Sequence, residues 1–152
     1  MGVVTLVTVL GSTAAVGCGG RSDGAELAER LALHEEAIER FAAWALRTTR
    51  TITPRDRERI EETLFAPVRD DDRILIVRVE RDGRVPIRAT HPHEGELPVG
   101  LAWTTVRSPR LGIVSVARDP DAPEVLWARV EVGASDPPPL LLTLALRPLP
   151  PE

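Results

Sequence analysis

The hydrophobic pattern of this chain changes its period near Arg73, and this change constrains the fold more than any other feature. Before Arg73, apolar residues recur every three or four positions, which is typical of amphipathic helices. After Arg73, apolar and polar residues alternate in short runs separated by turns that contain Gly or Pro, which is typical of strands. Helices that precede strands joined by short turns indicate an α+β domain with an antiparallel sheet.

A long helix is expected near the start of the domain. Asp23 is a suitable N-cap with Glu26 three residues later, and helix-forming residues continue to Arg47. The apolar stripe of this helix comprises Leu27, Leu31, Ile38, Phe41 and Ala45. His34 falls within the stripe, and the absence of a second histidine to match it favours a buried residue satisfied by a carbonyl over a ligand or a pH switch.

A second, shorter helix is expected over residues 53–66. Thr53 can cap its start, Pro54 occupies the first helical position, and Asp56 lies in the first turn. Pro67 should end it, because the residue before a proline avoids the helical region.

The strongest local signal is a hairpin. Two alternating runs, 74–81 and 84–90, flank Asp82-Gly83, a pair that favours a tight turn because glycine accepts positive φ. Pro86 lacks an amide donor, so the second strand is expected at a sheet edge or at a bulge. Further strands are expected over 101–107, 111–118, 124–132 and 140–147. Residues 140–146 are apolar on both faces, which predicts a central strand covered by a helix.

These elements predict one α+β domain over residues 25–147, with one long and one short N-terminal helix followed by a five- to six-stranded antiparallel sheet. Residues 18–152 suffice for one domain. The Pro-rich residues 148–152 are expected to form a disordered tail.

The N-terminal segment indicates export. Residues 1–17 are uncharged and apolar, as in a secretory signal peptide. They end in Ala15-Val16-Gly17-Cys18, which resembles the lipobox of bacterial lipoproteins. The resemblance implies that Cys18 is lipidated and anchors the chain to the membrane of the cell envelope, that residues 18–24 form a tether, and that the domain lies in the periplasm or at the cell surface. Cleaved secretion without a lipid, and a Cys18 buried as a small hydrophobe, stay open as alternatives.

Two stretches resemble a family of sensors. The hairpin and its following loop, ILIVRVERDGRVPIRATHPHEGELPVG over 74–100, and the later stretch LGIVSVARDPDAPEVLWARVEVG over 111–133, are similar to PAS-like extracellular sensor domains called Cache. The resemblance implies a ligand-binding domain. Because the family usually continues into a second membrane helix and a signalling module, this chain would signal through a partner.

Composition and motifs exclude some functions. The net charge is −4 and both signs are interspersed, which argues against nucleic-acid binding. Cys18 is the only cysteine, so no intramolecular disulfide is expected. The sequence contains neither a His-Glu-x-x-His motif nor a Walker loop. We therefore expect no enzymatic activity and no cofactor.

Residues of the kinds that bind metal ions cluster at the end of the hairpin. His91 and His93, spaced i and i+2, could face one side of an extended segment, with Glu94 or Glu96 completing a site. Two imidazoles and one carboxylate do not specify a metal, and the pattern favours a solvent-exposed loop.

A second candidate site is a small-molecule pocket. Trp103 and Arg107 lie on the same face of one expected strand, and an indole beside a guanidinium could bind an anionic or aromatic ligand, with Arg88 contributing. The alternative is a half-buried Trp and a surface cation. The sequence thus predicts a non-catalytic module that binds a small molecule or an envelope protein, or else a structural or assembly protein. A closed pocket on the core face near Trp103 would favour the first function, and an exposed apolar patch would favour the second.

Overall fold

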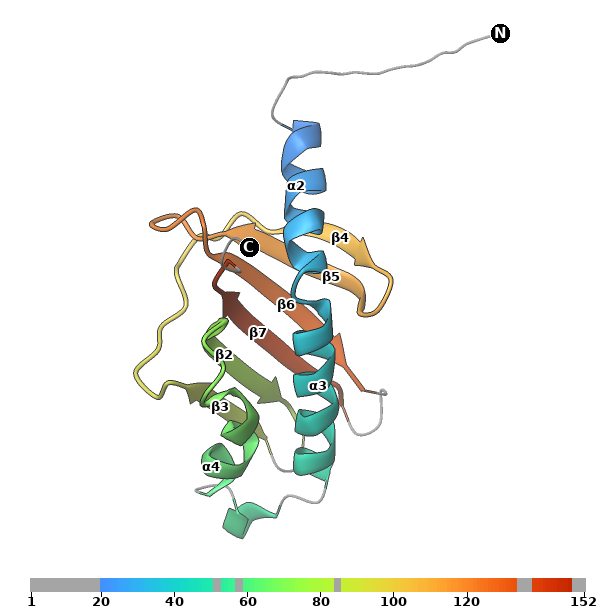
Figure 1. Ribbon diagram of the computed structural model, residues 1–152. Helices are drawn as coiled ribbons and strands as arrows, with labels where there is room; N and C mark the ends of the chain where they lie inside the picture. Colours follow the sequence, from blue (N-terminus) through green and yellow to red (C-terminus); the bar gives the residue numbers. More distant parts are fainter. Residues whose placement is uncertain (1–19, 51–52, 57–58, 84–85, 134–137, 149–152) are drawn as a thin grey trace, which may run out of the picture.

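The computed structural model describes residues 20–50, 53–56, 59–83, 86–133 and 138–148. It confirms an α+β architecture, in which the described helices cover one face of a six-stranded antiparallel sheet (Figure 1). The expected signal peptide, Cys18 and residues 149–152 lie outside the described residues. Within the described part of the chain, no helix is both long enough and apolar enough to cross a membrane.

The sheet is continuous and entirely antiparallel. Its order is β3-β2-β7-β6-β5-β4. The strands are β2 (Ile74–Arg81), β3 (Ile87–His91), β4 (Thr104–Ser108), β5 (Gly112–Arg118), β6 (Leu126–Val132) and β7 (Leu140–Leu146). The central position predicted for β7 is confirmed, because β7 lies between β2 and β6. The edge position predicted from Pro86 is also confirmed, because the edge strand β3 begins directly after that residue.

The prediction of one helix over 23–47 is wrong. The structure has two helices there, α2 (Gly20–Ala32) and α3 (Glu35–Arg50), with a turn at Leu33 and His34 between them. The amide of His34 donates to the Leu31 carbonyl at 2.8 Å, three residues back, so the α-helical pattern is interrupted. Because α2 begins at Gly20, most of the expected tether 18–24 is helical.

A buried carboxylate directly follows the turn. Glu35 is 8 % exposed, and its Oε2 accepts hydrogen bonds from the Ser108 hydroxyl and, at 3.5 Å, from the Arg110 amide. A buried carboxylate requires such donors. Glu35 therefore fixes the first turn of α3 to the β4–β5 turn, whereas α2 packs on β4, β5 and β6.

The helix expected over 53–66 is also broken. The N-cap prediction is confirmed in part, because Thr53 Oγ1 and the Thr53 amide donate to Asp56 Oδ2 at 2.7 and 3.2 Å. Only a 3₁₀ turn follows there, and the α-helix is the five-residue α4 (Ile60–Leu64), followed by a second 3₁₀ turn at Ala66–Val68. Two buried side chains, Ile60 and Leu64, hold this short helix against the core.

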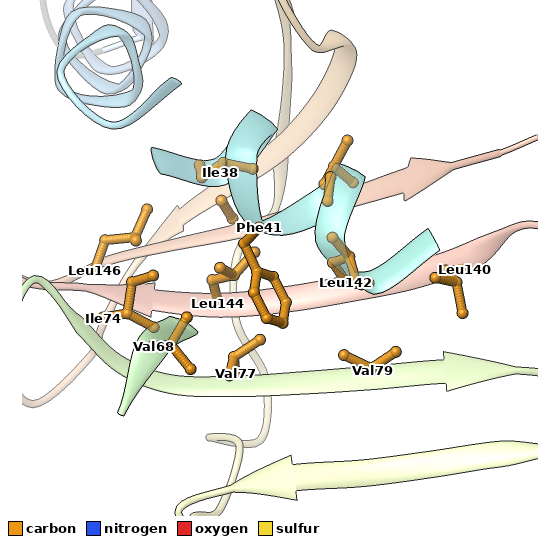
Figure 2. Packing of buried hydrophobic residues seen from close by; sticks show 14 of the residues in the cluster. Ile38, Phe41, Val68, Ile74, Val77, Val79, Leu140, Leu142, Leu144 and Leu146 are labelled. Carbon is orange, nitrogen blue, oxygen red and sulfur yellow. The ribbon is translucent and has the colours of Figure 1, made fainter. Parts of the chain in front are cut away.

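The core lies between the helices and one face of the sheet. Figure 2 shows Ile38 and Phe41 of α3 above the alternate leucines of β7 and the valines of β2. These buried positions include Leu140, Leu142, Leu144, Leu146, Val77 and Val79. Burial of each such side chain contributes about 1.5–3 kcal/mol. The prediction that a helix covers the central strand is confirmed.

The opposite face of the sheet has a smaller apolar cluster. Ala117, Trp127 and Ala145 are buried there, and Leu101 and Trp103 of the β3–β4 loop pack against them. Beyond this cluster the strands carry polar residues, and we call the sheet face away from the helices the open face. It holds the candidate site.

Candidate functional site

Each strand contributes one polar residue to a row that crosses the open face. The strand registers align Arg78 with Thr90 and Thr143, Arg129 with Thr143 and Ser115, and Ser115 with Thr105. The cross-strand row therefore comprises Thr90, Arg78, Thr143, Arg129, Ser115 and Thr105. It places two guanidinium groups on either side of one hydroxyl.

The alternation of each strand produces this row. Val130 and Ala128 of β6 are buried against the helices, so Arg129 between them must point to the open face. Leu142 and Leu144 of β7 fix Thr143 in the same way. A register slip by one residue would turn the leucines outward, so burial on the helix side holds the polar row in place.

Arg129 is the most unusual residue of the row. Its guanidinium carbon lies 4.3 Å from the centroid of the Trp103 ring, in a cation–π contact. Its Nε is buried without a hydrogen-bond partner among the described residues, and so is Oγ1 of the neighbouring Thr143, which is 1 % exposed. A buried polar atom without a partner costs about 1–3 kcal/mol, so a hydrogen-bonding group placed against these two atoms would be stabilising.

The second guanidinium of the row, that of Arg78, has a neutral partner among the described residues. Nε of Arg78 donates to Thr90 Oγ1 at 3.2 Å. Among the described residues, neither Arg78 nor Arg129 has a carboxylate partner within 4.0 Å, whereas Glu80 in the adjacent row pairs with Arg88 at 3.4 Å. The centre of the cross-strand row is therefore a place where positive charge is not neutralised by an ion pair.

Two open hollows adjoin the row. One of about 370 Å³ is lined by Ile113, Ser115, Arg129, Glu131 and Leu141. The other, of the same volume, shares Glu131 and Leu141 and extends toward Arg88 and Pro138. Both are open to solvent. A small molecule could therefore lie on the sheet with one end at Arg129.

The structure revises the predicted pair of Trp103 and Arg107. The two residues share the open face, as expected, because Arg107 pairs with Ile113 of β5. The guanidinium that contacts the indole, however, belongs to Arg129. The reason is geometric: Trp103 lies over β6, two strands away from the edge strand that carries Arg107.

Arg88 does not join Arg107 in one site. Its side chain is 79 % exposed and lies on β3, at the opposite edge of the sheet from β4. Arg129 was missed because its proximity to Trp103 depends on the pairing of β4, β5 and β6. The only available signal was an arginine at an outward position between two inward residues of a strand.

The structure does not bring His91, His93 and Glu94, the residues of the candidate metal site, together. His91 points to the helix side, where its ring stacks on Phe65 with centroids 5.4 Å apart. His93 lies beyond the end of β3, exposed, with Nδ1 3.5 Å from Glu61 Oε1, and Glu94 is exposed. The extended i, i+2 geometry does not continue past His91, and no group of three or more potential ligands forms among the described residues.

One spacing typical of hydrolases occurs at the start of α2. Gly20, Ser22 and Gly24 match the Gly-x-Ser-x-Gly pattern of a nucleophile elbow. The elbow requires the serine at a sharp strand-to-helix turn, whereas these residues form the first turns of a helix. The match does not create that geometry.

Asp119 fixes the apolar part of the open face. Trp127 Nε1 donates to Asp119 Oδ2 at 2.9 Å, and the amides of Asp121 and Ala122 donate to Asp119 Oδ1 at 2.9 and 3.1 Å. Burial alone would raise the pKa of this carboxyl, but the three hydrogen bonds lower it overall. Asp119 therefore holds the Trp127 indole beneath the β3–β4 loop.

Comparison with known proteins gives no relative. No protein-family model matches the chain, no curated protein is similar to it, and no solved structure matches its fold.

Proposed function

We propose that this chain is a lipoprotein of the bacterial cell envelope whose domain is a non-catalytic, sensor-like binding module. Its ligand is a small anion, for which an aromatic carboxylate is the best match, held on the open face at Arg129. The observation that carries this proposal is the guanidinium of Arg129, fixed by Trp103 and without a carboxylate partner among the described residues.

The surroundings of Arg129 suit a carboxylate. Stacking on Trp103 fixes the plane of the guanidinium, and a fixed guanidinium presents its donors to a carboxylate at a smaller entropic cost. Ser115 lies beside it in register, and the adjacent hollow offers Ile113 and Leu141 to an apolar ring. Glu131, two residues from Arg129 on β6, lines the same hollow and disfavours a ligand with a second negative charge.

The row suits binding better than catalysis. Guanidiniums and hydroxyls hold anions, but a hydroxyl needs an adjacent base to act as a nucleophile. All three histidines of the chain lie elsewhere: His34 at the α2–α3 turn, His91 against Phe65, and His93 beside Glu61. No imidazole is therefore available to activate Ser115 or Thr143.

The Cache resemblance supports a sensor. The helices lie on one face, and the β2–β3 hairpin forms one edge of an antiparallel sheet that leaves its other face available. A closed pocket on the core face was expected for a sensor. That face is instead filled by apolar side chains, so we place the ligand on the opposite face. Such a sensor would pass its signal to a partner protein of the envelope.

The alternative of an assembly protein has weaker support. Among the residues that the structure describes, three large apolar side chains are strongly exposed: Leu33 at 59 %, Val99 at 96 % and Ile113 at 63 %. They lie on a helix–helix turn, a loop and a strand, respectively. Apolar residues exposed singly are normal on a protein surface and do not form an assembly patch.

The anchor is tested by mass spectrometry of the protein isolated from the membrane fraction. The expected product begins at Cys18 and carries a diacylglyceryl group on the sulfur. The Cys18→Ala variant should lose the lipid and leave the membrane fraction. An unmodified chain that retains residues 1–17 would refute the lipoprotein assignment.

Ligand binding is tested by isothermal titration calorimetry of the full chain with benzoate. The expected result is a saturable heat that is lost in Arg129→Gln. A matched control is Arg40→Gln, because Arg40 is an exposed arginine of α3 that pairs with Glu36 on the helix side. Equal binding by the wild type and Arg129→Gln, or no binding by either, would refute the assigned site.

A further inference from the structure

The turn between α2 and α3 contains a buried histidine. His34 is 3 % exposed, and its Nδ1 is buried without a hydrogen-bond partner among the described residues. Its backbone still supports both helices, because its amide donates to Leu31 and its carbonyl accepts from Ile38 at 3.0 Å. The side chain is therefore enclosed at the one point where the helical path changes.

The charged groups around His34 disfavour a second positive charge. Arg30 approaches from α2, and Arg73 approaches from the segment before β2. Asp71 is the nearby acid, but both of its oxygens already accept hydrogen bonds from Arg73, at 2.9–3.1 Å. A protonated imidazole would thus meet two guanidiniums and one carboxylate that is already engaged.

The neutral imidazole is therefore the form that the fold stabilises. Burial first, and then Arg73 and Arg30, hold the pKa of His34 below its usual range, while Asp71 opposes this shift. A pKa lowered in the folded state means that the stabilisation is complete above the unfolded value of about 6.5 and is lost as the pH falls through the folded value.

The contacts that hold α2 include the arginine beside His34. Arg30 Nη2 donates to the Glu124 carbonyl at 2.6 Å, and Arg118 pairs with Glu26 at 2.5 Å. The first turn of α3 is fixed separately, by the hydrogen bonds from the β4–β5 turn to Glu35. The two helices thus have independent attachments on either side of His34.

We propose that the α2–α3 turn is an acid-sensitive hinge, in which protonation of His34 displaces Arg30 and releases α2 from β4, β5 and β6 while α3 stays on the sheet. The hinge does not depend on ligand binding at Arg129. If Cys18 anchors the chain, the hinge lies between the anchor and the open face and changes how that face is presented.

Hydrogen exchange with mass spectrometry tests the hinge. The full chain is compared at pH 7.5 and 5.0, with exchange corrected for the intrinsic effect of pH. Peptides from residues 24–32 should exchange several-fold faster at pH 5.0, while peptides from β7 and α3 should keep their protection. The His34→Phe variant, which cannot be protonated, should remove this pH effect, and the control variant His93→Gln should retain it.

The hinge would be overturned by unchanged protection of α2 at pH 5.0, or by equal loss of protection in α2, α3 and β7, which would indicate global unfolding. Persistence of the pH effect in the His34→Phe variant would also overturn the hinge. If that variant does not fold, an NMR titration of His34 in the wild type decides the question. A midpoint below about 6.5 that coincides with the loss of protection in α2 supports the hinge, and a midpoint at or above about 6.5, or one that does not coincide with that loss, refutes it.

Discussion

Two adjacent leucines of β7 offer a sharp test of how the sheet is oriented. Leu142 is fully buried, lies between Val79 and Val130 in register, and faces α3. Leu141 points to the open face and lines its hollows. The variants Leu142→Ala and Leu141→Ala therefore remove the same atoms from opposite sides of one strand.

The two substitutions are expected to lower the free energy of unfolding by different amounts, because only Leu142 is fully buried. Removing three carbons from Leu142 loses about 2.4 kcal/mol of transfer free energy, at about 0.8 kcal/mol for each carbon. The cavity left under α3 raises the total to about 3–4 kcal/mol. Leu141 is half-buried, so its truncation loses about 1 kcal/mol, and solvent fills the space. The difference between the variants is about 2–3 kcal/mol.

Urea denaturation followed by far-UV circular dichroism measures this difference at pH 7. Both variants should unfold with the wild-type dependence on urea concentration, which shows that the same surface is exposed. Equal destabilisation by the two variants, or a larger loss in Leu141→Ala, would refute the assigned register of β7. It would also remove the basis for placing Thr143 on the open face.

Three further predictions concern polar contacts. Glu35→Gln should lower the free energy of unfolding by about 1–3 kcal/mol, because Ser108 loses a charged acceptor in a buried site. Urea denaturation measures this free energy, and an unchanged value would contradict the buried contact. The Arg73 hydrogen bonds lower the pKa of Asp71, so its stabilisation is present above the unfolded value of about 4 and is lost as the pH falls through the folded value. Asp71→Asn should therefore lose less stability than the wild type between pH 7 and pH 3, whereas the exposed-site control Asp72→Asn should behave like the wild type. Trp103→Leu should weaken benzoate binding in calorimetry, because the Arg129 guanidinium loses a cation–π contact worth about 0.5–2 kcal/mol. An unchanged affinity for benzoate would exclude a role for the Trp103 indole.

The strands were predictable because their signals are local. Asp82-Gly83 and the alternation on either side specify a hairpin without reference to the rest of the chain. The apolar residues of 140–146 indicated a central strand covered by a helix, and β7 lies between β2 and β6 with α3 over one face. Pro86 correctly indicated an edge.

The break in the first helix was not predictable from periodicity. The apolar stripe stays in phase through His34, so the pattern of one helix and that of two helices are the same. The first residue of α3, Glu35, is held by Ser108, which lies 73 residues away in the sequence. Long-range polar contacts of this kind leave no local trace.

One of the two main residues of the candidate site, Trp103, could be predicted from the sequence, and the other, Arg129, could not. Trp103 could be selected as an indole at the start of a strand, but its partner depends on the order of β4, β5 and β6. Arg129 therefore emerged only with the sheet register. The spacing of His91 and His93 suggested that both side chains face the same side of one strand. β3 ends at His91, so His93 does not continue that alternation.

Anion binding at Arg129 is tested most directly by NMR of the arginine Nε–Hε groups during a benzoate titration. The Arg129→Gln variant assigns the Arg129 signal, and Arg40 serves as the reference on the helix side. The predicted result is a saturable shift of the Arg129 signal, with a smaller one at Arg78 and none at Arg40. A titration that leaves the Arg129 signal unchanged, or that shifts all the arginines alike, would contradict a binding site on the open face.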